Sequence, residues 1–319
     1  MNVTLKQFRY FEALVRHGHF GRAAEASAIS QPALSVQVKE LETSLGINLF
    51  ERDARHVRLT SFGEEVAMRI RDILRSVDEL GNLARASRGK LAGRLRIGVI
   101  PTIAPYLLPS VLCNLAHEYD GLEVQVRETL TWKIIQELEE GRLDTAIVAL
   151  PISLPWLTEI ALLTESFVLV RSSEDEGKPA PDPDALREMR LLLLEDGHCF
   201  RDQALSFCKM STRSTPWKSL DASSLATLVQ MVGAGLGVTL VPEMAVAVET
   251  RSAPVSIAHF ANPRPSRIIG MIWRKTNPLA KQFVQLSKVV RHSAAQMREQ
   301  CSNLPRPSRP PHSRSPRRR

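Results

Sequence analysis

The chain has 319 residues, of which 44% are hydrophobic, and it carries a formal net charge of +8. This length suggests two or three domains, and the hydrophobic content is ordinary for a globular protein. No run of 18 or more apolar residues is present, and the first ten residues lack the apolar core of a signal peptide. We therefore expect a cytoplasmic protein with no transmembrane helix.

Charge and cysteine content narrow the class of protein further. Six arginines and no acidic residue lie in 301–319, and without them the chain would be near +2, so its basicity is weak evidence for DNA binding by the folded part. Four cysteines in a chain of this length do not form a structural disulfide framework, and cytosolic disulfides tend to be redox-sensing or catalytic. No CxxC or clustered His and Cys spacing predicts zinc, and we expect no metal or other cofactor.

The first sixty residues have the spacing of three helices. Apolar residues recur at helical spacing from Thr4 to His17, a short helix follows over Phe20–Ser27, and Ser30 caps a third helix that ends at Gly46. Two short helices, a tight turn and a polar-faced third helix predict a helix-turn-helix, whose second helix enters the major groove. An ordinary three-helix domain with solvated polar faces has the same spacing and remains an alternative.

The third helix and the segment after it supply candidate DNA contacts. Gln31 and Ser35 have donors and acceptors that suit base edges. Residues Leu49–Leu59 predict a hairpin wing, whose arginines would contact phosphates and fix position without reading sequence. The DNA-binding candidates are Ser30, Gln31, Pro32, Ser35, Lys39, Arg52, Arg55 and Arg58.

A long amphipathic helix is predicted from Thr60 to about Ser87, followed by a hinge that ends at Lys90. Its apolar residues alternate in steps of four and three, which is the spacing of a coiled-coil seam: Val66, Ile70, Ile73, Val77, Leu80 and Ala84. A coiled coil between two copies would present two recognition helices to an inverted repeat in DNA. A helix packed on its own domain is the alternative.

From about Leu91 to Gln300 strands alternate with helices, which predicts a parallel α/β sheet arranged in two lobes. The expected strands are Arg94–Ile100, Leu122–Glu128, Thr145–Leu150, Glu165–Arg171, Val238–Leu240 and Ile268–Arg274, and the expected helices are Ile103–Tyr119, Thr131–Glu140, Ser223–Val232 and Pro278–Met297. Thr102 and Thr129 lie at strand ends, where α/β folds bind ligands. The acidic, proline-rich stretch Ser172–Asp184 departs from a compact connection.

Two of the four cysteines lie close together in the sequence, within Leu194–Cys208. Cys199 follows His198 and lies two positions before Arg201, and nearby cations lower a thiol pKa. A helix is predicted over Arg201–Cys208, which would place Cys199 at or just before its N-terminus. The helix dipole there also stabilises an anion.

The spacing of this pair predicts a mechanical consequence. If one helix carried both cysteines, its rise would separate them by about 13 Å, whereas a disulfide needs Cα atoms within about 7 Å. Pairing would therefore require the helix to unwind, which predicts a two-state element. A buried core Cys208 beside Phe207 and an incidental Cys199 fit the spacing as well. Cys113 is expected in the core and Cys301 on the surface.

Several short motifs resemble those of LysR-type transcriptional regulators, in the family's order and spacing. They are Phe20-Gly-Arg-Ala-Ala, Ser30-Gln-Pro-Ala-Leu-Ser35, Lys39-Glu-Leu-Glu42, Leu45-Gly, Leu49-Phe-Glu-Arg52 and Leu59-Thr-Ser-Phe-Gly63. The resemblance implies a winged helix-turn-helix (1–59), a linker helix and hinge (60–90), and a two-lobed periplasmic-binding-protein-like α/β regulatory domain (91–300). The tail 301–319 lies outside it, and its Pro, Ser and Arg content predicts disorder.

Four longer stretches resemble, more narrowly, the hydrogen-peroxide-sensing members of that family: Ile100–Pro109, Leu143–Pro151, Leu194–Cys208 and Met231–Pro242. The resemblance implies that Cys199 is the peroxidatic thiol and Cys208 the resolving thiol. It also implies a peroxide pocket formed by Thr102, Thr129, His198, Asp202 and Arg267. Further implied partners are promoter DNA with an inverted repeat, RNA polymerase, a thioredoxin or glutaredoxin reductant, and further copies in a homotetramer built as a dimer of dimers.

Three other functions compete with redox regulation. The first is a LysR-type regulator that binds a small organic effector between the lobes, with silent cysteines. The second is a thiol peroxidase, against which the complete DNA-binding half argues, so we expect no enzyme. The third is a solute-binding protein, which the missing signal peptide and the helix-turn-helix disfavour.

Overall fold

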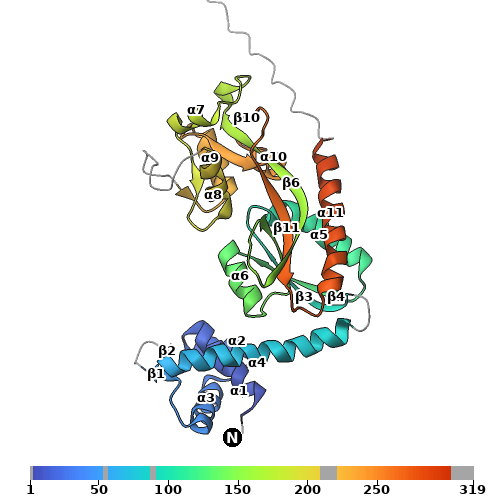
Figure 1. The fold of residues 1–319 in the computed structure, drawn as a ribbon. Helices are drawn as coiled ribbons and strands as arrows, with labels where there is room; N and C mark the ends of the chain where they lie inside the picture. The colour runs from blue at the N-terminus through green and yellow to red at the C-terminus, as the bar shows by residue number, and fades with distance from the viewer. Residues whose placement is uncertain (1–2, 53–56, 87–90, 209–220, 303–319) are drawn as a thin grey trace, which may run out of the picture. The chain divides into compact units, whose positions relative to one another are not determined.

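The computed structural model describes residues 3–52, 57–86, 91–208 and 221–302 (Figure 1). Two compact units divide the chain, the first with the N-terminal residues and the second with most of the chain from Leu91 on. Within these described ranges, no helix combines the length and apolarity that a bilayer crossing requires. The hinge predicted at residues 87–90 and nearly all of the tail lie outside the described residues.

The N-terminal unit contains four helices and a hairpin, and their order is that of a winged helix-turn-helix. The elements are α1 (Leu5–His17), α2 (Phe20–Ala26), α3 (Gln31–Leu45), β1 (Phe50–Arg52), β2 (Val57–Leu59) and α4 (Ser61–Ala86). The predicted ends of the first three helices are confirmed to within a residue. Ser30 accepts a hydrogen bond from the Ala33 amide at 3.3 Å, and Gly46 ends α3 with a left-handed φ of 75°.

A hydrophobic core joins these helices and anchors the wing. Leu34, Val38 and Leu41 of α3 are fully buried, as the predicted stripe requires. The buried carboxylate of Glu42 accepts hydrogen bonds from the backbone amides of Leu49 at 2.8 Å and Phe50 at 3.2 Å. The wing is therefore fixed to the C-terminal half of α3, and the opposite, polar side of α3 stays open.

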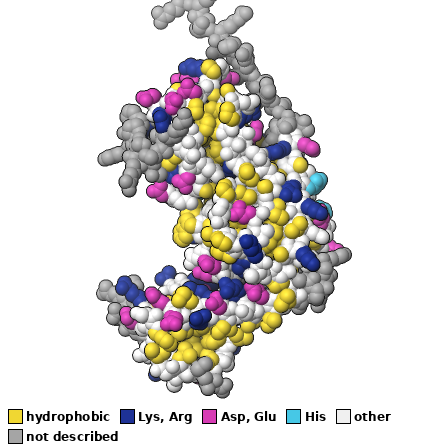
Figure 2. Space-filling model, viewed as in Figure 1, with side chains coloured by type: hydrophobic (Ala, Val, Ile, Leu, Met, Phe, Trp, Pro, Cys, Tyr) yellow, Lys and Arg dark blue, Asp and Glu magenta, His cyan; other side chains and the backbone are white. Residues whose placement is uncertain are grey.

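Helix α4 leaves part of its predicted seam uncovered. Ile70 is buried in the core of the unit, but Ile73 and Leu80 are 41% and 66% exposed. Figure 2 shows hydrophobic side chains gathered along α4 on the face in view. An apolar seam that points to solvent in a single copy is what a dimerisation helix requires.

A seven-stranded sheet forms the centre of the second unit, in the order β10-β6-β11-β5-β3-β4 with β9 beside β6. Its strands are β3 (Gly93–Val99), β4 (Leu122–Glu128), β5 (Thr145–Leu150), β6 (Leu157–Ser172), β9 (Thr239–Pro242), β10 (Val255–His259) and β11 (Ser266–Arg274). Strand β3 pairs in parallel with β4 and β5, whereas β11 is antiparallel to both β5 and β6. The expected parallel pairing is therefore found for β3, β4 and β5 and for the short pair Leu193–Leu194 with Asp221–Ala222, whereas β6, β9, β10 and β11 pair antiparallel.

Strand β6 is longer than the sequence predicted, because the predicted strand began only at Glu165. It spans 16 residues and starts at Leu157. Its first half pairs with β11, and its second half pairs with β9 and β10. One strand thus belongs to both lobes, and its early residues gain strand pairing from β11, more than a hundred positions away, which no local pattern signals.

The remaining elements of the second unit are α5 (Ala104–Glu118), α6 (Thr131–Glu139), η1 (Ser173–Asp175), α7 (Pro183–Glu188), β7 (Leu193–Leu194), α8 (Cys199–Phe207), β8 (Asp221–Ala222), α9 (Leu225–Gly233), α10 (Glu243–Glu249) and α11 (Ala280–Ser302). Of these, β7 and β8 form a small parallel sheet of their own. Figure 1 shows α6 on one face of the first lobe's sheet and α5 with α11 on the other. The divergent stretch Ser172–Asp184 contains η1 and the Asp182 cap of α7.

The prediction that Cys113 lies in the core is wrong, because this residue is exposed. The buried side of α5 includes Leu107, Val111 and Leu115. A residue two positions after Val111 lies about 200° around the helix, on the opposite side. The side chain of Cys301 lies outside the described residues.

Candidate functional site

Cys199 is the first residue of α8, as the sequence predicted, and its thiol is half-buried. His198 occupies the N-cap position without a side-chain cap, and Gly197 before it has a φ of 96°. The thiol faces a cavity with ≈ 180 Å³ of empty space. Three segments line that cavity: Ile100, Pro101 and Thr102 after β3, Leu130 and Thr131 at the start of α6, and Gly197, His198, Cys199 and Phe200 at the start of α8.

Arg267 of β11 holds one side of this cavity in place. Its guanidinium is buried and donates hydrogen bonds to the hydroxyl and the carbonyl of Thr102, at 2.7 and 2.9 Å. It also pairs with the buried carboxylate of Glu165 at 2.7 Å, which in turn accepts the Met244 amide at 2.9 Å. The guanidinium carbon lies 5.5 Å from the ring centroid of Phe200. A fixed positive charge is therefore placed beside the reactive helix terminus.

Several opposing influences set the pKa of Cys199. Burial is the largest and raises the pKa above its ordinary value. Hydrogen bonding from the Thr131 hydroxyl lowers the pKa, as does the charge of Arg267, while Asp202 raises it. The Thr131 hydroxyl is buried and has no hydrogen-bond partner of normal geometry among the described residues, so it is free to donate to the sulfur or to a molecule in the cavity. The resting thiol is thus mainly protonated at neutral pH.

The sequence prediction that His198 and Arg201 lower this pKa is wrong. Burial lowers the pKa of His198 below its ordinary value, so its ring is mainly neutral at physiological pH. The guanidinium of Arg201 is buried and pairs with Asp196 at 3.0 Å and Asp221 at 2.9 Å. The Arg201 guanidinium therefore binds the start of α8 to the neighbouring loop and is engaged by these two carboxylates, not by the sulfur of Cys199.

The structure brings together three of the predicted pocket residues and separates two others. Thr102 and His198 line the cavity, and Arg267 binds Thr102. Asp202 is exposed and does not line the cavity, although its charge still acts on the thiol. Thr129 is half-buried and does not line it either; its amide donates to the Val99 carbonyl at 3.1 Å.

Thr131 lines the cavity but was not among the residues predicted from the sequence. It lies two positions after Thr129, at the first residue of α6, and lines the cavity. Both threonines follow the same strand, so their order in sequence does not reveal which hydroxyl turns inward. The sequence did offer one signal for Thr131: it lies at the predicted start of a helix that follows a strand. The N-terminus of a helix favours anions.

Cys208 lies at the other end of α8, where it is the C-cap residue and is fully buried. Burial raises the pKa of its thiol to about 11. Its carbonyl accepts a hydrogen bond from Arg187 at 2.9 Å, and the neighbouring Phe207 packs edge-on against Phe260 at 5.0 Å. Both thiols are free, and one helix carries them, so the helical rise keeps them about 13 Å apart.

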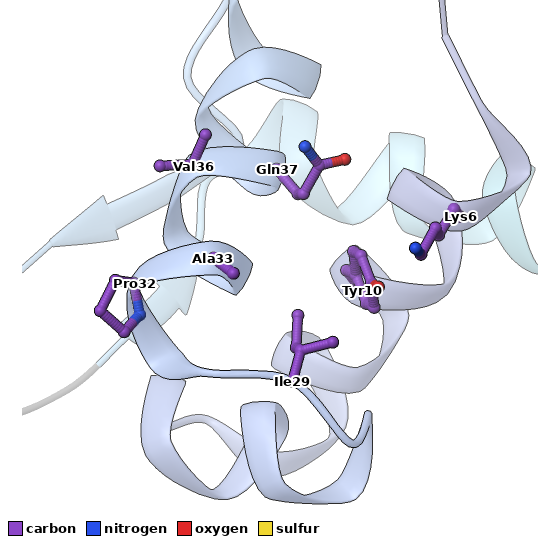
Figure 3. Close-up of a pocket in the computed structure, with 7 residues that line it drawn as sticks. All are labelled: Lys6, Tyr10, Ile29, Pro32, Ala33, Val36 and Gln37. Carbon is purple, nitrogen blue, oxygen red and sulfur yellow. The ribbon is translucent and has the colours of Figure 1, made fainter.

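The recognition surface of the N-terminal unit shows which candidate residues are accessible. Gln31, Pro32, Lys39 and Arg58 are exposed, and Ser35 is half-buried. Figure 3 shows a groove between the starts of α1 and α3, lined by Lys6, Tyr10, Ile29, Pro32, Ala33, Val36 and Gln37. Val36 is 54% exposed on the recognition helix and was not among the predicted contacts. Arg55 and the side chain of Arg52 lie outside the described residues.

Comparison with known proteins agrees with this architecture. Residues 5–64 match the family model of the bacterial regulatory helix-turn-helix protein, lysR family, and residues 88–294 match that of the LysR substrate binding domain. The chain therefore belongs to the LysR family of bacterial transcriptional regulators. The part of the chain that the structure describes contains no group of three or more His, Cys, Asp or Glu residues able to hold a metal ion.

Within that family, the chain is similar to proteins named for their response to hydrogen peroxide. A probable hydrogen peroxide-inducible genes activator of Streptomyces viridosporus is 42% identical over 95% of this chain and 96% of its own length. The DNA-binding transcriptional dual regulator OxyR of Escherichia coli is 36% identical over 91% and 95%. A solved structure of Corynebacterium glutamicum OxyR, a cysteine-to-serine mutant bound to hydrogen peroxide, is 35% identical, covers 95% and 96%, and has a TM-score of 0.66.

Proposed function

We propose that this protein is a DNA-binding transcriptional regulator that senses hydrogen peroxide through a reversible Cys199–Cys208 disulfide and controls oxidative-stress genes. The observation that carries the proposal is the placement of two free thiols at opposite ends of one helix, α8. Cys199 lines a small cavity with hydroxyl and imidazole groups around it and the Arg267 guanidinium bound to Thr102, and Cys208 is buried in the core. The names of its relatives point to the same oxidant.

The chemistry begins at the sulfur of Cys199. Its thiolate attacks one oxygen of hydrogen peroxide, the O–O bond breaks, and the leaving hydroxide takes a proton and departs as water. The sulfur becomes a sulfenic acid. The Thr102 and Thr131 hydroxyls and the His198 ring can orient the peroxide, while Arg267 stabilises negative charge at the helix start.

Cys208 then completes the switch. Its sulfur displaces the hydroxyl of the sulfenic acid as water, which leaves the two sulfurs joined. A disulfide needs Cα atoms within about 7 Å, and an intact α8 holds them about 13 Å apart. The bond therefore selects a state in which α8 is unwound, and a thioredoxin or glutaredoxin system would restore the dithiol by exchange.

The size of the cavity argues against the organic-effector alternative. Pockets that hold drug-sized ligands have volumes of about 300–1,000 Å³. The cavity beside Cys199 leaves no room for a ligand of that size in this conformation. A molecule as small as hydrogen peroxide suits this space better than a metabolite does.

Promoter recognition is assigned to the N-terminal unit. Gln31 and Ser35 of α3 would meet base edges, and the exposed Val36 would contact a thymine methyl group in the major groove. The exposed Lys39 and Arg58 would contact phosphates. The seam on α4 would pair two copies on an inverted repeat, and two such dimers would form a homotetramer that contacts RNA polymerase from the promoter, in the cytoplasm.

A thiol map with parallel promoter binding tests the proposal. Reduced full-length protein receives one equivalent of hydrogen peroxide, free thiols are alkylated, and linked peptides are identified by mass spectrometry while the DNA footprint is recorded. We expect a Cys199–Cys208 link and an altered footprint, and neither in Cys199→Ser. Cys113→Ser is the matched control, because Cys113 is exposed but lies outside the cavity. Unchanged alkylation at both Cys199 and Cys208 would rule out the proposal.

A further inference from the structure

We infer that Trp132 and Leu130 cover the mouth of the Cys199 cavity and set the largest hydroperoxide that reaches the thiol. The inference rests on the proposed peroxide chemistry at Cys199. It adds a specificity determinant to that site: the side chains select among oxidants by size and take no part in bond breaking.

Trp132 does not line the cavity but lies beside Gly197, which does. It follows the lining residue Thr131 in the first turn of α6, and its side chain is 53% exposed. Gly197 lies across from it, where a Cβ atom would be 3.2 Å from Leu130 Cδ1 and 3.6 Å from Trp132 Nε1. Leu130 and the indole therefore pack against the backbone that leads directly into Cys199.

This cover joins two separate segments of the chain. Leu130 and Trp132 lie at the start of α6 in the first lobe, and Gly197 lies just before α8 in the second. The φ of 96° at Gly197 and its missing side chain permit the close approach. The contact is between apolar side chains and backbone, so a rotamer change of Trp132 opens it on a fast timescale without disturbing a strand or helix. The Lys133 ammonium, 5.1 Å from the indole centroid, stabilises the indole in its present position.

The chemistry gives no reason to prefer one hydroperoxide over another. For hydrogen peroxide and for an organic hydroperoxide alike, the thiolate bonds to the terminal oxygen and the O–O bond breaks. The leaving hydroxide or alkoxide takes a proton and departs as water or alcohol, and the sulfur becomes a sulfenic acid. Because the same bonds change, selection arises from access to the small cavity that Cys199 lines.

Competing oxidants test the role of the cover. The rate of Cys199 oxidation in the reduced full-length protein is measured with hydrogen peroxide and with cumene hydroperoxide, and the ratio of the two rate constants is compared between variants. We expect Trp132→Ala to lower this ratio about tenfold, which is the scale of discrimination by a pocket's shape. Trp132→Phe keeps a ring over the mouth and should stay near wild type. Trp156→Ala removes an indole from the turn before β6, where the Trp156 carbonyl accepts the Lys275 amide, and not from beside Gly197, and should leave the ratio unchanged.

Two outcomes would overturn the inference. One is an unchanged ratio in Trp132→Ala, and the other is an equal fall in Trp156→Ala. A bulky maleimide distinguishes lost cover from lost folding, because Cys208 is fully buried in the folded state. If Trp132→Ala loses selectivity and its Cys208 also reacts with the maleimide, the variant has lost its fold. That result counts against the cover. If wild-type Cys199 fails to react with hydrogen peroxide at all, the proposed function fails; if it reacts equally with both oxidants, only the cover fails.

Discussion

Phe207→Leu is expected to shift the equilibrium between dithiol and disulfide without touching the Cys199 cavity. Phe207 is the last residue of α8, and its ring packs against Phe260 at 5.0 Å with an interplanar angle of 67°. Such an aromatic pair contributes roughly 0.5–1.5 kcal/mol beyond the area it buries. The disulfide cannot form while α8 is helical, so this contact stabilises the reduced state alone.

The size of the shift follows from that difference. Loss of about 1 kcal/mol from the reduced state makes the reduction potential of a two-electron couple about 20 mV more negative. Equilibration in graded glutathione redox buffers, followed by acid quenching, alkylation and mass spectrometry, resolves a shift of this size. The rate of sulfenic acid formation at Cys199 should remain that of the wild type, because Phe207 does not line the cavity.

Phe283→Leu is the matched control. Phe283 packs edge-on against Trp273 at 5.7 Å in the first lobe, away from the redox helix in sequence and in fold. Both variants should lower thermal stability, but only Phe207→Leu should change the potential. An unchanged potential in Phe207→Leu, or an equal change in Phe283→Leu, would refute the reasoning that α8 must unwind.

Three further predictions concern the thiol, the dimer and DNA. Arg267→Met removes a charge that lowers the pKa of Cys199, so alkylation of that thiol at pH 7 should slow. In the wild type burial raises the pKa of Cys199. Its alkylation rate should therefore keep rising from pH 7 to 9 as the thiolate fraction grows. Leu80→Glu places a charge on the exposed seam and should dissociate the α4 dimer in sedimentation experiments. In DNA-binding titrations over a range of salt concentrations, Gln31→Ala should cost about 1–3 kcal/mol on the specific site only, whereas Arg58→Ala should weaken all sites and reduce the salt slope by about 1.

Each of these has an outcome that contradicts it. An alkylation rate that is flat between pH 7 and 9 would show a thiol already ionised at neutral pH. Met68 is 59% exposed on α4 but off the seam, so Met68→Glu should leave the dimer intact; dissociation of both variants would argue against the seam. An equal loss of specific and nonspecific binding in Gln31→Ala would mean that this side chain reads no base.

The features that the sequence determined are those set by neighbours along the chain. The ends of α1 and α3 follow from Thr4, Ser30, Gly18 and Gly46, each of which acts on backbone within four residues. The placement of Cys199 at a helix start, nine positions before Cys208, is equally local. Since helical rise fixes their separation, the need for α8 to unwind could be predicted before any fold was known.

The tertiary structure alone decided which groups surround the sulfur. Arg267 reaches Thr102 across 165 positions of sequence, and Thr131 rather than Thr129 turns toward the cavity. The direction of the Cys199 pKa shift depends on how much water the packed lobes exclude, and burial outweighs the nearby donors. Desolvation and long-range partners are properties of packing between distant segments, so no spacing within one segment could have supplied them.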